Sequence, residues 1–205
     1  MRVIEIKENW GLDHLTLSER PCPQPGPGEV LLKMEAASLN YRDLVVVSGG
    51  YGRRAGSLPL VPVSDGAGTV SQLGEGVTGL EVGDRVCPLL FQDWLAGELD
   101  DPTSLTSLGG PLDGTLAEYM AVKASGLVKV PEHLSATEAA TLPCAGLTGW
   151  AAVVGQGIRP GDLVLILGTG GVALFGLQFA KLAGAEVIIT SKSDEKLKRA
   201  RDLGA

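Results

Sequence analysis

The stretch from Asp162 to Thr190 constrains the fold of this chain more than any other. Leu163 to Leu167 is a run of five apolar residues without alternation, which predicts a strand buried on both faces, as in a parallel sheet. A glycine-rich turn follows, then an apolar segment with helical spacing, and residues 186–190 form a second β-prone run. Strand, glycine turn, helix and strand within about thirty residues predict a right-handed βαβ unit.

The glycine turn has the spacing of a dinucleotide-binding fingerprint. Gly168 and Gly170 hold its first two positions, and Ala173 provides the small third side chain. Glycine permits turn conformations that a Cβ forbids, and the following helix N-terminus offers N–H donors to a pyrophosphate. We therefore predict a nucleotide site formed by Gly168, Thr169, Gly170, Gly171 and Val172. The alternative is a tight strand-to-helix turn without a ligand.

Charge and cysteine content restrict the partners and the compartment. The chain has 205 residues and a net charge of −7, which argues against nucleic acid or an anionic membrane as partner. No apolar run approaches membrane-spanning length, and the first ten residues do not resemble a signal peptide. The three scattered cysteines suggest reduced thiols rather than a disulfide framework. These features predict a cytoplasmic protein that acts on a small molecule.

The first 130 residues have the pattern of an irregular β-barrel, with short strands separated by glycine turns. The predicted strands lie at 1–6, 15–17, 29–37, 63–70, 82–86, 117–122 and 127–130. A proline-rich surface connector is expected at 21–28, and a short helix near Tyr41. Residues 92–114 have little pattern and are long enough to form a functional or lid-like loop. A helix start at Ser135 leads to a helical link through Ala152.

Several motifs together resemble the medium-chain dehydrogenase/reductase superfamily over essentially the whole chain. They are Pro27-Gly28-Glu29-Val30, Gly74-Glu75-Gly76-Val77, Val82-Gly83-Asp84-Arg85-Val86, Pro143-Cys144-Ala145-Gly146-Leu147-Thr148, Gly168-Thr169-Gly170-Gly171-Val172 and the terminal Leu203-Gly204-Ala205. The chain looks most like the zinc-free branch related to quinone oxidoreductases. The resemblance implies an α/β protein with a GroES-like irregular β-barrel domain at 1–130, a connecting helical segment at 131–160 and the first βαβα portion of a Rossmann domain at 161–205.

The resemblance also implies that the Rossmann domain is partial. A complete domain has the strand order 3-2-1-4-5-6, whereas this chain stops after the second strand and its helix. We expect the chain to be truncated, or its missing part to come from another chain. The full-length form is expected to be a homo-oligomer.

Zinc-dependent members of the superfamily bind their catalytic metal through a Cys, a His-Glu pair and a second Cys or His. The matching positions here are Asn40, Ser64-Asp65 and Cys144, a set that does not suit Zn²⁺. The segment that should hold the structural four-cysteine lobe, 88–114, contains no cysteine. No zinc is therefore expected.

Without a metal, developing negative charge on a substrate oxygen needs another electrophile. A tyrosine hydroxyl or an asparagine amide can donate to that oxygen, so the predicted catalytic residues are Asn40, Tyr41, Tyr51 and Asp65. Asp65 is as well explained as a plain turn residue, and Tyr41 is undecided. The alternative for Asn40 and Asp43 is that both are buried turn residues bonded to backbone, and for Asp43 this interpretation is at least as good.

The resemblance places Cys144 and Thr148 among the cofactor-binding residues, although the Thr148 hydroxyl could simply bond a preceding helix carbonyl. Ser191 stands where NAD-preferring members have a carboxylate, and Lys192 and Lys196 follow it. This predicts NADP(H) in preference to NAD(H). The alternative for both lysines is a solvated helix start. The predicted function is zinc-independent hydride transfer to or from a quinone, an enone or an aldehyde/alcohol pair. The alternative is a truncated, catalytically silent nucleotide-binding or interaction module.

Overall fold

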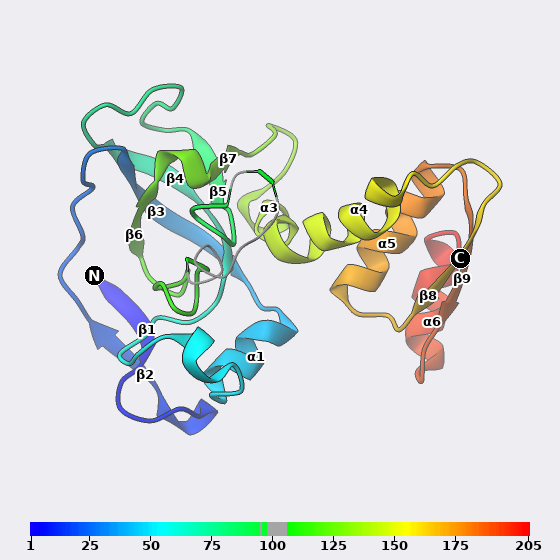
Figure 1. The fold of residues 1–205 in the computed structure, drawn as a ribbon, viewed down its shortest axis with the longest axis horizontal. Helices are drawn as coiled ribbons and strands as arrows, with labels where there is room; N and C mark the ends of the chain where they lie inside the picture. Colours follow the sequence, from blue (N-terminus) through cyan, green and yellow to red (C-terminus); the bar gives the residue numbers. More distant parts are fainter. Residues whose placement is uncertain (95, 98–105) are drawn as a thin grey trace. The chain divides into compact units, whose positions relative to one another are not determined.

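The computed structural model describes residues 1–94, 96–97 and 106–205, and the chain forms two compact units, Met1–Pro143 and Cys144–Ala205 (Figure 1). The predicted lid-like loop at 92–114 therefore lies partly outside the described residues. The predicted linking segment at 131–160 is shared between the units, with the division at Pro143. Each unit is described by itself.

The first unit is built on antiparallel strands. β3 (Glu29–Ser38) and β4 (Asp65–Leu73) form the centre of a five-stranded sheet in the order β6-β3-β4-β5-β7. The remaining members are β5 (Arg85–Pro88), β6 (Tyr119–Lys123) and β7 (Leu127–Lys129). β1 (Arg2–Ile6) and β2 (Leu15–Glu19) form a separate hairpin next to the segment that leads into β6, where the Ile4 N–H donates to the Leu116 carbonyl at 2.9 Å. The predicted irregular, barrel-like β architecture is confirmed.

Buried apolar residues of these strands form the core of the first unit. Val30 and Leu32 of β3 point inward and are fully buried, with Val70 of β4 and Val86 of β5 beside them. Burying an aliphatic side chain of this size contributes about 1.5–3 kcal/mol, so this cluster is the main stabilising element of the unit. It fixes the register of β3 and β4, whose ends carry the polar residues described below.

Short helices complete the first unit. α1 (Tyr41–Val47) contributes Val46 to a small cluster with Ala55, Leu60 and Trp10. α3 (Ala136–Ala139) begins with a complete capping box between Ser135 and Glu138, and it packs alanines on the sheet beside Cys87. The 3₁₀ turns are η1 (Leu12–His14), η2 (Gly52–Ala55) and η3 (Ala124–Gly126).

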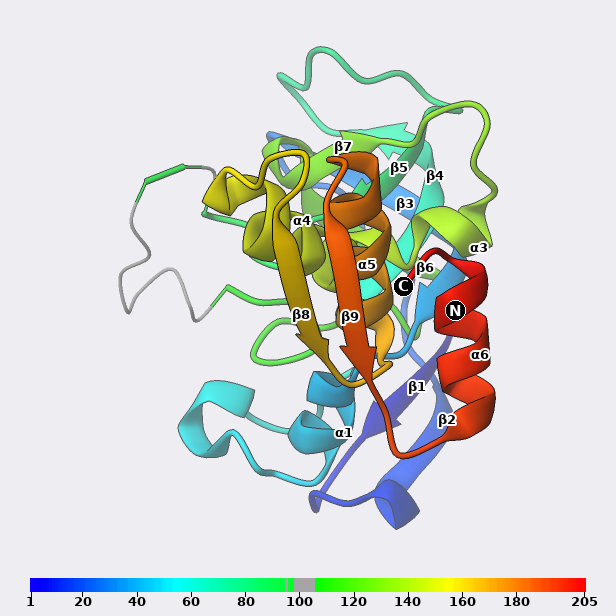
Figure 2. The same ribbon diagram turned by 90° about the vertical axis from the view of Figure 1, so that its right-hand side faces the viewer.

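The second unit contains the predicted βαβ arrangement. β8 (Leu163–Leu167) and β9 (Glu186–Thr190) are parallel and in register, joined by α5 (Gly171–Leu182) and followed by α6 (Asp194–Asp202) (Figures 1 and 2). A π-helical turn η4 (Leu142–Gly146), helix α4 (Leu147–Val153) and a 3₁₀ turn η5 (Val154–Gln156) precede them. Leu177 and Ala180 of α5 and Ala200 of α6 pack on one face of the strands.

The prediction that residues 163–167 are buried on both faces is wrong for this structure. Val164 and Ile166 face the helices, whereas Leu163, Leu165 and Leu167 remain 64%, 60% and 75% exposed. Figure 2 shows the two strands with α5 behind them. Both helices of the βαβα unit cover the same face, and within the described part of the chain no second layer covers the other. Only one face of the apolar strand β8 is therefore covered in the described part of the chain.

Candidate functional site

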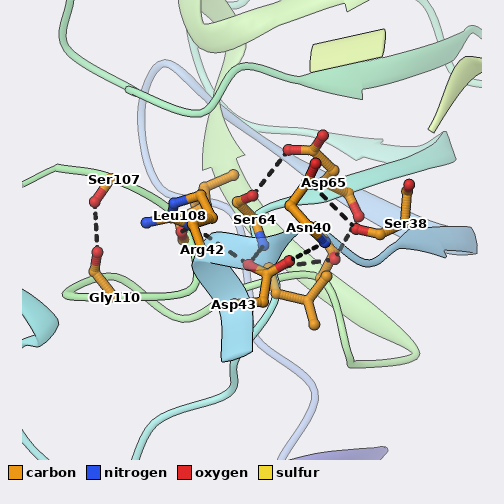
Figure 3. A network of polar contacts seen from close by, with 11 residues as sticks. Ser38, Asn40, Arg42, Asp43, Ser64, Asp65, Ser107, Leu108 and Gly110 are labelled. Atoms are coloured by element: carbon orange, nitrogen blue, oxygen red, sulfur yellow. Dashed lines mark hydrogen bonds and ion pairs between the residues drawn. The ribbon is translucent and has the colours of Figure 1, made fainter. Parts of the chain in front are cut away.

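A buried carboxylate organises the polar residues around the start of α1 (Figure 3). Asp43 is 3% exposed, and its two oxygens accept separate backbone N–H groups. The Asn40 N–H donates to Oδ2 at 2.7 Å, and the Ser64 N–H donates to Oδ1 at 3.1 Å. Asp43 thus satisfies an otherwise unpaired helix N-terminal amide and ties α1 to the segment that leads into β4.

Arg42 completes this arrangement. Its guanidinium donates to the Leu108 carbonyl at 3.1 Å and lies 3.5 Å from Asp43 Oδ1. Burial raises the pKa of Asp43, and the two backbone hydrogen bonds and the charge of Arg42 lower it, with a net pKa above the ordinary value. Desolvation therefore outweighs the pairing at this site.

The segment before β4 has a strained backbone. Val63 has φ 75°, a left-handed conformation that is unfavourable for a β-branched residue. A Cβ on Gly114 would lie 2.0 Å from the Val63 carbonyl oxygen, and one on Gly109 would lie 2.7 Å from its carbonyl carbon. The Thr115 N–H also donates to the Val63 carbonyl at 2.8 Å. This close packing holds Val63 in its conformation and directs the Ser64 N–H toward Asp43.

Ser64 and Asp65 are fully buried at the start of β4. The Ser64 hydroxyl donates to Asp65 Oδ1 at 2.9 Å, and the Thr115 hydroxyl donates to the Asp65 backbone carbonyl at 2.8 Å. Burial, together with the nearby charge of Asp65, raises the pKa of Cys87 to about 11. Asp65 is therefore part of the buried interior of the first unit.

The four predicted catalytic residues have different environments. Asn40 is partly buried at the N-cap of α1, and Asp65 belongs to the buried network. Tyr41 and Tyr51 are 82% and 42% exposed. The structure thus brings Asn40 and Asp65 into one region with Asp43. The two tyrosines are exposed residues of the first unit and do not belong to this buried network.

The described residues contain no group of three or more His, Cys, Asp or Glu side chains that could hold a metal ion. Around α1, the Ser64 hydroxyl and both oxygens of Asp43 are already engaged in hydrogen bonds within the protein. The donors available at Asn40 and Ser64 are an amide and a hydroxyl, which are weak ligands for Zn²⁺.

The predicted nucleotide turn lies between β8 and α5. Gly168 has φ 90°, and a Cβ at Gly168 or at Gly170 would meet nothing within 4 Å, so space outside the turn is open. The Leu174 N–H donates to the Gly170 carbonyl at 3.0 Å as α5 begins. The amides of Gly171, Val172 and Ala173 precede this first helical bond and have no acceptor within the helix. The turn is therefore suited to bind an anion.

The end of β9 is connected to this turn by side chains. The Ser191 and Thr169 hydroxyl oxygens are 2.9 Å apart, and the Ser193 N–H donates to Ser191 Oγ at 3.3 Å. The Ser193 hydroxyl accepts the Lys196 N–H and caps α6. The Lys192 and Lys196 side chains are exposed.

Thr148 and Cys144 lie one helical turn apart. The Thr148 hydroxyl donates to the Cys144 carbonyl at 2.6 Å, which is the helix-internal bond that the sequence left open as an alternative. Thr148 is exposed and Cys144 partly buried. This hydroxyl retains acceptor capacity while it donates inward.

Sequence reasoning missed several residues of these sites. Asp43 is the buried residue bonded to backbone that the sequence offered as one interpretation. The strained backbone of Val63, by contrast, has no sequence signal because valine rarely adopts positive φ. Thr115 is distant in sequence and joins Asp65 only through the fold. The Thr169–Ser191 contact could have been suspected from two hydroxyl residues at equivalent strand ends.

Comparison with known proteins identifies the family. The alcohol dehydrogenase GroES-like domain matches residues 26–132, more than half of the chain. The chain belongs to this family. The medium-chain dehydrogenase/reductase superfamily predicted from the motifs and the GroES-like barrel domain are thereby confirmed. The second unit has the predicted βαβα order.

Three proteins similar to this chain have names that describe oxidoreductases. A zinc-type alcohol dehydrogenase-like protein of Schizosaccharomyces pombe is 47% identical over 209 residues, covering 100% of this chain and 60% of the relative. A cobalt- and zinc-bound thermostable alcohol dehydrogenase from Pyrobaculum aerophilum superposes with a TM-score of 0.90 at 34% identity, over 100% of this chain and 64% of that one. A mycobacterial quinone oxidoreductase has a TM-score of 0.78 at 32% identity, over 100% and 57%.

The coverage of these matches limits what can be said of the chain's activity. The chain spans about 60% of the length of the curated relative from Schizosaccharomyces pombe, so the activity of whole relatives does not pass to it directly. Its family is one of oxidoreductases. In the described part of the chain, no helix has the length and apolar character needed to cross a membrane.

Proposed function

We propose that this chain serves as a zinc-independent oxidoreductase that prefers NADP(H) and transfers hydride to or from a quinone, an enone or an aldehyde/alcohol pair. The observation that carries this proposal is the open glycine turn at the start of α5, beside strand ends that carry hydroxyls in place of a carboxylate. The oxidoreductase character of the family supports the same conclusion.

The residues of the second unit fit a dinucleotide. The amides of residues 171–173 would bind its pyrophosphate, and Ser191 with Lys192 and Lys196 would surround a 2′-phosphate. Thr148 and Cys144 are proposed to line the nicotinamide end. When bound, the nicotinamide would supply or accept the hydride. Asp194 and Glu195 oppose the positive charge, so the preference depends on close hydrogen bonds as well as on lysine charge.

In the first unit, Asn40, Tyr41 and Tyr51 are the proposed donors to a substrate oxygen. Asp43 positions Asn40 through its backbone N–H, and the buried Ser64–Asp65 pair supports the same region from β4. The residues at the positions of the superfamily's zinc ligands do not fit zinc, so developing negative charge would be stabilised by neutral hydroxyl and amide donors.

The cofactor assignment is tested by calorimetric titration of NADPH and NADH into wild type and Ser191→Asp. Wild type should bind NADPH more tightly, and Ser191→Asp should reverse or abolish the preference because a carboxylate repels a 2′-phosphate. Ser57→Asp, the same change at an exposed position of the first unit, is the control. Equal affinities in wild type, or an unchanged ratio in Ser191→Asp, would contradict the assignment.

Zinc independence is tested by elemental analysis of the purified chain after mild chelation. We expect no stoichiometric zinc, because Asn40 and Ser64 supply no thiolate or imidazole. One tightly held zinc ion per chain would refute this part of the proposal.

A second candidate is a nucleotide-binding module without hydride transfer. It is favoured by the span of the chain, about 60% of the Schizosaccharomyces pombe relative. The two functions differ in NADPH oxidation with a panel of quinones and enones. The assay should compare this chain with a fusion that adds the remaining C-terminal part of that relative. Cofactor binding without turnover in both proteins would favour the module, whereas turnover in either would favour the oxidoreductase.

A further inference from the structure

We propose that Thr169 is a second specificity residue for the cofactor, because its hydroxyl prepares the Ser191 hydroxyl to donate to a 2′-phosphate. This inference rests on the proposed NADP(H) function and concerns the same site. The two side chains are called the hydroxyl pair below.

The hydroxyl pair lies on a well-defined scaffold. β8 and β9 are parallel and end in register, with Leu167 opposite Thr190, so the residues that follow them emerge at the same edge. The Gly168 N–H donates to the Thr190 carbonyl at 3.0 Å and continues the ladder by one bond. Thr169 and Ser191 are the next residues on each side, both partly buried, with their oxygens 2.9 Å apart.

The hydrogen-bond capacity of Ser191 defines the role of Thr169. A serine hydroxyl has one donor proton and two acceptor lone pairs. The Ser193 N–H uses one lone pair, at 3.3 Å. Either hydroxyl of the pair could be the donor in the 2.9 Å contact. In the proposed arrangement Thr169 is the donor, which leaves Ser191 with its single O–H as its remaining capacity. Phosphate oxygens only accept hydrogen bonds, so a serine prepared in this way matches a 2′-phosphate.

The same arrangement disfavours the unphosphorylated ribose. A ribose hydroxyl gains most from a partner that accepts its proton, as the carboxylate of NAD-preferring proteins does. With Thr169 as the donor, both lone pairs of Ser191 are occupied, and Ser191 cannot accept that proton. Two incoming hydrogen bonds also polarise the Ser191 O–H and strengthen it as a donor.

The charged side chains near the hydroxyl pair are of both signs and partly offset one another. Lys192 and Lys196 are countered by Asp194 and Glu195, and all four side chains are exposed. Arg199 lies 3.2 Å from Glu195 and compensates part of its charge. Exposed charges are screened by salt, whereas the partly buried hydroxyl pair is held by hydrogen bonds of 2.9 and 3.3 Å. Discrimination should therefore depend strongly on the pair.

The test compares wild type with Thr169→Val, which keeps the shape but removes the hydroxyl, and with Thr169→Ser, which keeps the hydroxyl. Affinities of the whole chain for NADPH and NADH are measured by calorimetry, and 2′,5′-ADP and 5′-AMP serve as probes of the 2′-phosphate alone. We expect Thr169→Val to weaken NADPH and 2′,5′-ADP roughly tenfold, corresponding to loss of one positioned hydrogen bond. NADH and 5′-AMP should change less than about twofold, and Thr169→Ser should stay close to wild type.

Other results would overturn the inference. Parallel weakening of all four ligands by Thr169→Val, with a lowered melting temperature, would show a merely structural role. An unchanged NADPH/NADH ratio in Thr169→Val, with the wild-type preference intact, would remove Thr169 as a specificity residue and leave the proposed function standing. Failure of wild type to bind any of the four ligands would overturn both.

Discussion

Replacement of Asp43 by asparagine should destabilise the first unit by about 2–4 kcal/mol. The two oxygens of Asp43 accept the N–H groups of Asn40 and Ser64 at 2.7 and 3.1 Å, and the side chain is 3% exposed. Asparagine has the same shape but only one oxygen. Its NH₂ group must therefore face one of these two backbone donors.

The magnitude follows from the bonds that change. A buried amide without an acceptor costs about 1–3 kcal/mol, and replacing a charged acceptor by a neutral one in the remaining bond costs about 1 kcal/mol more. Arg42 loses its carboxylate neighbour but keeps the Leu108 carbonyl at 3.1 Å, so its contribution changes little. Relief from burying the carboxylate charge, whose pKa is raised by burial, offsets part of the loss.

Urea unfolding followed by Trp10 fluorescence measures this effect locally, because Trp10 packs with Val46 of α1. A background of Trp94→Phe and Trp150→Phe removes the other two tryptophans. The midpoint should fall without a change in the urea dependence. Asp13→Asn, at an exposed position, is the matched control and should stay within about 0.5 kcal/mol. An equally small effect for Asp43→Asn would refute the role of Asp43 as a double acceptor.

Three further predictions follow from the same structure. In urea unfolding, Val63→Gly should destabilise the chain by about 1–2 kcal/mol less than Val61→Gly. Both valines are 2% exposed, but only at Val63 does glycine remove the strain of a positive φ. Equal losses of unfolding free energy in the two variants would argue against strain at Val63. Burial raises the pKa of Asp43 above 3.8, so the contribution of this group to stability is complete below pH 3.8 and is lost as the pH rises through the folded pKa. The difference in unfolding free energy between wild type and Asp43→Asn should therefore be larger at acid than at neutral pH. A difference that grows toward neutral pH would reverse the assigned sign. β8 is an edge strand of its described two-stranded sheet and has three exposed leucines, so the chain should self-associate at high concentration in light scattering. Leu165→Lys should reduce this self-association, and Leu17→Lys, at an exposed position of β2, should not. A monomeric wild type would count against the prediction.

Much of the fold could be predicted because local patterns and tertiary structure agree. The βαβ unit was predictable since the apolar run 163–167, the glycine turn and the spacing of α5 each indicate the same arrangement. The strands of the first unit were predictable from short β-prone runs separated by glycine turns. The exposure of Leu163, Leu165 and Leu167 was not predictable, because an unbroken apolar run carries no information about which of its faces is covered.

The candidate sites were predictable only in part. Residue types indicated Asn40, Asp65 and Ser191, and resemblance gave them roles that binding and activity measurements must test. The contacts that orient them could not be inferred, because they join residues far apart in the sequence. Asp43 reaches Ser64 across 21 residues, and Thr115 reaches Asp65 across 50. Such contacts depend on the register of β4 and on the strained turn at Val63, neither of which has a local pattern.

The position of Cys87 beside Asp65 has a practical consequence for labelling. With a pKa of about 11, this buried thiol is ionised in only about one molecule in ten thousand at pH 7. Cys22 is exposed on the proline-rich connector, where thiol-directed reagents have free access. Brief maleimide treatment would therefore attach a spectroscopic probe to Cys22 on the connector and leave Cys87 unmodified. If Cys144, which is only partly buried, is first replaced by serine, Cys22 could in this way report on the first unit without any substitution in its core.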